Sequence, residues 1–237
     1  MINFSREILK DRNSAFVIDL DLFKTNLKNL KNSFSKYFPK VIIGYSYKTN
    51  YTPSICKASH EVGSWAEVVS EMELDMAILN LNEKEKHKII YNGPIKSESS
   101  LKKIIKHKGL ININSTHDLN LIKSLGLEFN FEKEINLCIR INATYNDNFS
   151  RFGSDEIEVE KIIETIQETK FLNLKGLHIH LPFRSIDSFN FRVEKLISVI
   201  SKYDNLQIDY LNIGGGFFGK ITKTLAKSLN LKNPPTF

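Results

Sequence analysis

Lys48 is the residue of this chain whose position most suggests chemistry. It ends an apolar and aromatic run, residues 41–47, that is typical of a buried strand. The polar pair Thr49 and Asn50 follows, and Pro53 is placed to open a helix. Burial disfavours the charged form of an amine, and the neutral amine is a nucleophile. We therefore interpret Lys48 as a candidate Schiff-base lysine, with a lysine that merely reaches the surface as the ordinary alternative.

Three further predicted strands carry, within them or at their ends, residues that could bind a ligand together with this amine. Arg140 lies inside one apolar segment, and the three glycines Gly214, Gly215 and Gly216 end another. His178 and His180 close a third strand on one face, because side chains alternate with period two. The carboxyl ends of parallel strands meet on one side of a barrel or open sheet, where ligands bind. The sequence thus predicts that these groups converge.

The alternation of strands and helices predicts the fold class, an α/β TIM-type barrel. Strands are expected at 41–47, 65–69, 88–92, 110–114, 135–141, 174–181 and 208–213, and helices at 53–62, 71–80, 98–107, 116–125, 156–169 and 186–202. An additional short strand is expected at 15–20, with Asp21 capping a helix that runs to about Tyr37, and Ser115 is a further cap signal. We interpret residues 1–237 as one barrel domain that lacks its eighth and last strand.

Composition excludes several classes of protein. The 237 residues are 41% hydrophobic and 25% charged, with a formal net charge of +6, which is ordinary for a soluble globular protein. The lysines have no nucleic-acid-binding motif around them, so we expect no nucleic-acid partner. Nothing in the sequence predicts a signal peptide, a membrane span or a metal site, and we expect a cytoplasmic protein. Cys56 and Cys138 fit small core residues better than a disulfide.

Eight short segments follow one another in a recognisable order along the chain. They are 45–50 (YSYKTN), 66–74 (AEVVSEMEL), 92–97 (NGPIKS), 113–115 (INS), 140–142 (RIN), 150–153 (SRFG), 176–180 (GLHIH) and 212–217 (NIGGGF). In this order they resemble the fold-type III pyridoxal-phosphate enzymes, of the alanine racemase and ornithine decarboxylase kind. The closest group is the ornithine/diaminopimelate/arginine decarboxylase family, and the resemblance covers about residues 15–230.

The resemblance implies pyridoxal 5'-phosphate as the cofactor and gives each residue a role. Lys48 would hold the cofactor as a Schiff base, His180 would stack on its pyridine ring, and Arg140 would bond near its phenolic oxygen. Gly214–Gly216 would offer N–H groups to the phosphate, and Glu67 matches an acidic position close to the lysine. Other interpretations remain open: His178 and His180 could be core histidines, Arg140 could pair with Glu67 structurally, and the glycines could form only a tight turn.

Two departures limit what the resemblance implies. The family continues its histidine motif with glycine and a phosphate-binding serine, where this chain has Leu181-Pro182-Phe183. The family's C-terminal β-domain and the glutamate that pairs with the pyridine nitrogen have no counterpart in the sequence.

The function expected from the resemblance is the N-terminal portion of an amino-acid decarboxylase for a basic or diamino acid, inactive alone. The expected partners are a small amino-acid substrate and a second copy of the chain or a complementary C-terminal half. A cofactor carrier, a catalytically silent regulatory homologue and a racemase stay open as alternatives.

Overall fold

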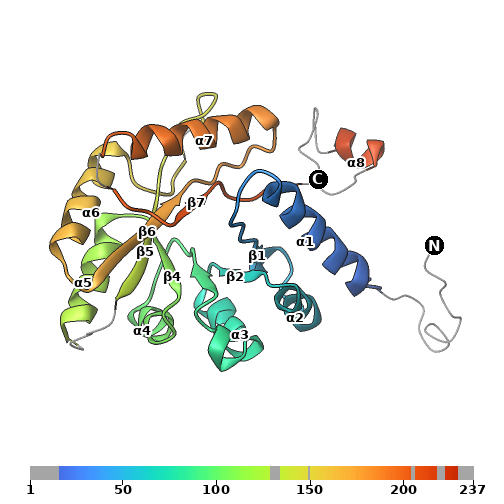
Figure 1. Ribbon diagram of the computed structural model, residues 1–237, viewed down its shortest axis with the longest axis horizontal. Helices are drawn as coiled ribbons and strands as arrows, with labels where there is room; N and C mark the ends of the chain where they lie inside the picture. The colour runs from blue at the N-terminus through green and yellow to red at the C-terminus, as the bar shows by residue number, and fades with distance from the viewer. Residues whose placement is uncertain (1–15, 129–133, 149, 204–205, 218–221, 229–237) are drawn as a thin grey trace, which may run out of the picture.

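The computed structural model describes residues 16–128, 134–148, 150–203, 206–217 and 222–228. Within them, one parallel sheet has seven strands in consecutive order, and helices cover its outer side (Figure 1). The strands are β1 (Gly44–Ser46), β2 (Trp65–Val68), β3 (Ile89–Tyr91), β4 (Leu110–Ile113), β5 (Ile135–Arg140), β6 (Leu172–His178) and β7 (Tyr210–Asn212). The helices are α1 (Leu20–Ser35), α2 (Pro53–Glu61), α3 (Glu71–Asn80), α4 (Glu98–Lys106), α5 (Thr116–Glu128), α6 (Glu156–Glu168), α7 (Ile186–Ile200) and α8 (Lys223–Ser228).

Side-chain caps fix where most of the long helices begin. Asp19, Ser70, Ser97, Asp155 and Ser185 each accept a hydrogen bond from the backbone N–H three residues further on. Each such bond satisfies an N–H group that the first turn of a helix leaves without a partner. Four of these caps end the connection that follows a strand, so α3, α4, α6 and α7 begin near the carboxyl edge of the sheet.

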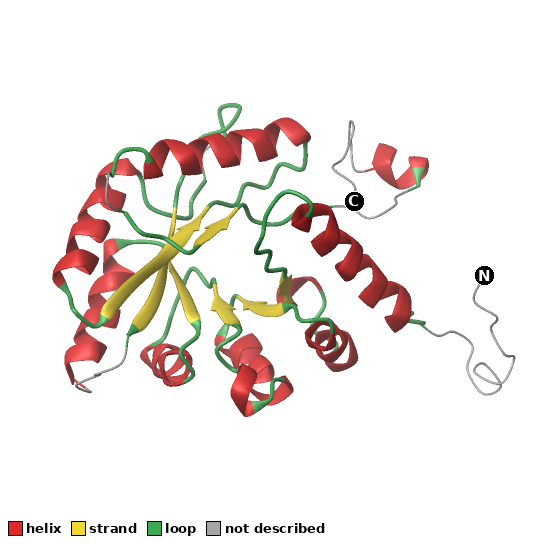
Figure 2. Cartoon of the chain, in the orientation of Figure 1, coloured by secondary structure: helices red, strands yellow, loops and turns green. Residues whose placement is uncertain are grey.

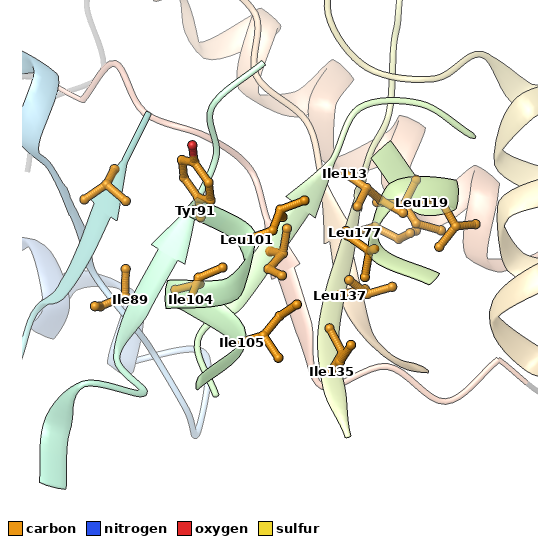
Figure 3. Packing of buried hydrophobic residues seen from close by; sticks show 14 of the residues in the cluster. Ile89, Tyr91, Leu101, Ile104, Ile105, Ile113, Leu119, Ile135, Leu137 and Leu177 are labelled. Carbon is orange, nitrogen blue, oxygen red and sulfur yellow. The ribbon is translucent and has the colours of Figure 1, made fainter. Parts of the chain in front are cut away.

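The core lies between the sheet and the helices around it. All four residues of β4 are buried, as are all three of β3, which is typical of parallel strands covered on both faces. Figure 3 shows Leu101 and Ile104 of α4 close to Ile89 and Tyr91 of β3. Packing of this kind holds each strand in place and leaves its carboxyl end free to carry polar residues.

The order of strands and helices predicted from the sequence is confirmed, and most boundaries agree within two residues. Two details at the beginning of the chain are wrong. The described part of the predicted strand 15–20 is not a strand: Phe16, Val17 and Ile18 are exposed, and no strand among the described residues pairs with them. The cap of α1 is Asp19 rather than Asp21, which lies in the first turn. Helix α8 was not predicted.

The environment of the first strand also differs from the prediction. Only residues 44–46 of the run 41–47 join the sheet, and Gly44 and Ile42 are exposed. The reason is that β1 pairs with β2 alone and so forms one edge of the sheet (Figure 2). The other edge is β7, which pairs with β6 alone.

Aromatic side chains connect α1, the helix before β1, to the segment after β7. Phe217 follows β7, and its ring lies 5.5 Å from that of Phe34 in α1 and 4.5 Å from that of Phe189 in α7, measured between centroids. Contacts of this kind stabilise modestly beyond the apolar area that they bury. The first helix and the segment after the last strand are therefore joined by side-chain packing.

A buried ion pair fixes two neighbouring loops at the carboxyl edge. Lys96 Nζ lies 2.9 Å from Asp118 Oδ2 and donates to the Gly93 carbonyl at 2.6 Å. The same carboxylate oxygen accepts the Asn114 N–H at 2.9 Å. Burial lowers the pKa of Lys96, and the Asp118 charge opposes that shift. The pair therefore joins the connection after β3 to the connection after β4.

We expect Lys96→Met to lower the free energy of unfolding by about 3–5 kcal/mol, because it leaves a buried carboxylate without its cation. The double variant Lys96→Met/Asp118→Asn should lose less, since the substituted amide carries no charge and its oxygen can still accept the Asn114 N–H. Urea denaturation measures the free energy of unfolding of the unchanged chain, the single variant and the double variant. Lys202→Met, which removes an exposed ion pair with Glu156, is the control and should change stability little. An equal loss in the single and double variants would contradict the assignment.

Candidate functional site

A pocket of about 430 Å³ opens at the carboxyl ends of the strands and contains three of the predicted site residues. Lys48 reaches it from the turn after β1, Arg140 from the end of β5 and His180 from the segment after β6. Its apolar wall includes Phe152 and Phe183. Glu67 and the three glycines are not among the lining residues, and each adjoins the pocket through a neighbour described below.

Lys48 lies in a single turn of 3₁₀ helix, η2 (Tyr47–Thr49), directly after β1. Two hydrogen bonds fix this turn: Thr49 Oγ1 donates to the Ser46 carbonyl at 2.7 Å, and Tyr45 Oη donates to the Asn50 carbonyl at 2.9 Å. The predicted desolvation of the lysine is wrong for the chain by itself, because Lys48 is exposed. Its amine nevertheless borders the pocket, where a bound ligand can cover it.

Glu67 begins a row of hydrogen-bonded side chains across the interior of the sheet. Its Oε1 accepts from Asn92 Nδ2 at 2.9 Å, and Asn92 Oδ1 accepts from Asn112 Nδ2 at 3.1 Å. Glu67 and Arg140 make no ion pair within 4 Å in the described structure. Burial lowers the pKa of Arg140, and the negative charge of Glu67 partly opposes that shift. Asn92 lines the pocket and thereby connects Glu67 to it. Neither asparagine was singled out from the sequence.

The two histidines differ in their surroundings. His178 is buried in β6, and burial, followed by the charge of Arg140, lowers its pKa well below the ordinary value. His180 borders the pocket, and burial followed by the charge of Arg192 lowers its pKa to about 4. Both rings are therefore neutral at physiological pH. His180 can present an uncharged ring face to a ligand, while His178 fits the core residue that the sequence analysis left open.

The segment 213–217, the glycine loop, contacts His180. Gly215 N–H donates to His180 Nδ1 at 3.4 Å, and Gly214 N–H donates to Asn212 Oδ1 at 2.9 Å. Gly216 N–H has no hydrogen-bond partner among the described residues. Gly214 has a φ of +73°, and a Cβ there would lie 2.7 Å from His180 Nδ1, so only glycine fits.

Arg192 is a feature of the site that the sequence analysis missed. It lies in α7 with a fully buried side chain, and its guanidinium donates to backbone carbonyls of the glycine loop and of the segment after β6. The sequence holds little signal for it, because a single arginine within an amphipathic helix is normally solvated. It places a positive charge behind the glycine loop.

The residues present fit an anionic phosphate group. Four cationic side chains contribute to the lowered pKa of His180: Arg192, Lys48, Arg140 and Arg184. A Cβ at Gly215 would meet no atom within 4 Å, so there is open space beside the backbone of the loop. Positive charge, a free N–H group and close access to backbone are what a phosphate monoester requires. The site therefore matches the phosphate end of the cofactor that the resemblance implies.

No helix in the described part of the chain is long and apolar enough to cross a membrane. Likewise, no group of three or more His, Cys, Asp or Glu side chains in the described ranges is placed to hold a metal ion.

The curated relatives that the chain matches include diaminopimelate decarboxylases. The chain is 28% identical over 225 residues to diaminopimelate decarboxylase of Aquifex aeolicus, a match of 88% of this chain and 52% of that protein. It is 28% identical over 218 residues to the enzyme of Bacillus methanolicus, covering 85% of the chain and 50% of the relative. The chain thus spans about half the length of the curated relatives that it matches.

Solved structures agree in fold. Diaminopimelate decarboxylase of Helicobacter pylori, complexed with L-lysine, superimposes with a TM-score of 0.74 at 22% identity, covering 90% of this chain and 55% of that one. The family model described as pyridoxal-dependent decarboxylase, pyridoxal binding domain, matches residues 24–233. These findings confirm the family, the barrel-type fold and the cofactor predicted from the sequence. The chain belongs to the pyridoxal-binding domain family of the pyridoxal-dependent decarboxylases.

Proposed function

We propose that this chain is the cofactor-binding part of an amino-acid decarboxylase that acts on a basic or diamino acid. One observation carries the proposal: a single pocket brings Lys48, Arg140 and His180 together at the carboxyl ends of a parallel sheet. When bound, pyridoxal phosphate supplies an electron sink for the charge left on the substrate as carbon dioxide departs. The protein's part is to hold, orient and surround that group.

Each residue of the site has a distinct task in this proposal. Lys48 Nζ would hold the cofactor covalently. His180 would present its neutral ring to the cofactor, and the Arg140 guanidinium would donate to an oxygen of the bound ligand. Gly216 would donate its free N–H group to the phosphate, Gly215 would give the phosphate close access to the backbone, and Gly214 lets the loop approach His180. Glu67 holds Asn92 at the edge of the pocket.

The substrate class is supported by the relatives. The curated matches are diaminopimelate decarboxylases, and the H. pylori structure was solved with L-lysine. We propose an amino acid with a second, distal amine as the substrate.

We also propose that residues 1–237 form one domain and that it acts with a partner. One hydrophobic cluster extends from Tyr47 in η2 to Val199 in α7, which supports a single unit. The free edges of β1 and β7 present unpaired backbone groups, which favour association. A second copy of the chain or a complementary C-terminal half is the expected partner.

Covalent attachment of the cofactor tests the role of Lys48 directly. After incubation with pyridoxal phosphate and reduction with borohydride, mass spectrometry should find the cofactor on the peptide that contains Lys48. Lys48→Arg keeps the charge but cannot form the bond, so it should carry no label. Lys57→Arg, on the neighbouring helix α2, is the matched control and should be labelled like the unchanged chain. Equal labelling of the Lys48→Arg protein would overturn the assignment.

The lowered pKa of His180 predicts how its ring titrates. The folded-state pKa is about 4, below the ordinary value of about 6.5, so the ring should stay neutral as pH falls from 8 to 5. Because the unfolded chain binds this proton more readily, stability should decrease as pH falls from about 6.5 toward 4. An NMR titration of the His180 Cε1–H resonance measures this. An inflection near 6.5 in the folded protein would contradict it, and urea-unfolded protein should show that inflection.

Release of carbon dioxide tests the reaction. We expect the chain to be inactive by itself and active toward diaminopimelate, lysine or ornithine when it is supplied with the C-terminal half of a relative. Leucine is the control substrate, since it lacks a distal amine. Cofactor binding without decarboxylation of any substrate in the reconstituted protein would refute the reaction while leaving the cofactor site intact.

A further inference from the structure

Arg192 joins the two segments that border the phosphate end of the site. Its Nη1 donates to the carbonyls of Ile213 and Gly215, both at 3.0 Å. Its Nη2 donates to the carbonyls of Leu181 at 2.9 Å and Phe183 at 2.5 Å. The guanidinium also packs on the Phe189 ring, 4.2 Å from its centroid. One side chain of α7 therefore fixes the backbone of both loops.

These bonds determine where the N–H groups of the glycine loop point. In a trans peptide the carbonyl and the following N–H lie in one plane and point in opposite directions. Since the Gly215 carbonyl is directed at Arg192, the Gly216 N–H of the same peptide is directed away from it. That N–H is also the one without a partner among the described residues, and its loop borders the open space at Gly215. Arg192 thus turns a free donor outward.

The charge of Arg192 is not balanced by a carboxylate. In the described structure it takes part in no ion pair, and its Nε has no hydrogen-bond partner. Burial alone accounts for the lowering of its pKa to about 10, so the group is still charged at neutral pH. A buried cation is costly unless a partner compensates it. Four carbonyls solvate the guanidinium, and an anion beside the loop would supply the missing charge.

We propose that Arg192 is a positioning residue for phosphate: it sets the glycine loop so that the free N–H group of Gly216 meets the phosphate of the cofactor, and it compensates the phosphate charge from behind. This places a binding determinant in α7, outside the strand ends. It also accounts for the absence of a serine at Leu181-Pro182-Phe183, because the anion is held from the glycine loop and Arg192. The inference rests on the proposed cofactor site.

The test compares pyridoxal phosphate with pyridoxal, which lacks the phosphate. Dissociation constants for both are measured by fluorescence with the unchanged chain, Arg192→Lys and Arg192→Met. We expect Arg192→Met to weaken the binding of pyridoxal phosphate by about ten- to a hundredfold, the range for hydrogen bonds to charged groups. The dissociation constant of pyridoxal should stay nearly unchanged. Arg192→Lys keeps the positive charge but lacks the planar guanidinium. Its dissociation constant for pyridoxal phosphate should therefore lie between those of the unchanged chain and Arg192→Met. Lys195→Met, which removes a half-buried lysine of α7 that pairs with Glu156, is the matched control.

Two further measurements guard against variants that do not fold. Gly215→Val puts carbon atoms into open space beside the loop, so it should fold and lose the preference for the phosphorylated ligand. In the unchanged chain, inorganic phosphate should shift the NMR signals of Arg192 Nε–H and Gly216 N–H.

Each outcome bears on a different claim. Equal weakening of both ligands by Arg192→Met, or an unchanged preference, would overturn the role of Arg192, and so would NMR signals that do not respond to phosphate. If the unchanged chain bound neither ligand, the proposed cofactor site itself would fail. Loss of the preference in Arg192→Met and Gly215→Val, with Lys195→Met unaffected, supports the inference.

Discussion

Parallel pairing of consecutive strands is the constraint on which the site depends. The register places Ser46 beside Glu67, Arg140 beside His178, and His178 beside Asn212. A shift of one residue in any pair would turn these side chains to the other face of the sheet. The apolar residues below them, such as those of β3 and β4, hold the register because the same shift would expose them. The core thus fixes the site by fixing the register.

Polar side chains at the carboxyl edge form a layer that the apolar core does not require. Asn112 Oδ1 and His178 Nδ1 are buried without hydrogen-bond partners in the described structure, while Glu67, Asn92 and Asn112 are joined in a row. Polar groups of this kind reduce stability when a partner is lacking. Their presence together at the carboxyl edge of the sheet is explained if that edge binds a ligand.

The sequence predicted those parts of the site that have a local pattern. Lys48 after an apolar run, alternating histidines and three adjacent glycines can be recognised from spacing alone, and strand–helix alternation predicts where they meet. Asn92 and Asn112 carry no such pattern, because they matter only through bonds across three strands. Arg192 is 21 to 23 residues from the glycine-loop carbonyls that it binds. The exposure of Lys48 follows from its place in the turn after an edge strand, which periodicity does not reveal.

The positions of Lys48 and the glycine loop give ligand binding a consequence for the fold. Lys48 follows β1 and the glycine loop follows β7, so the two ends of one cofactor molecule would be held at the two free edges of the sheet. In the chain itself, the segment after β7 reaches α1 through Phe217 and Phe34, and no backbone ladder joins β1 to β7 among the described strands. A ligand that binds only the folded state adds to stability in proportion to the logarithm of its concentration over its dissociation constant. Here that added stability would act across the gap in the sheet, because one ligand would contact both of its edges.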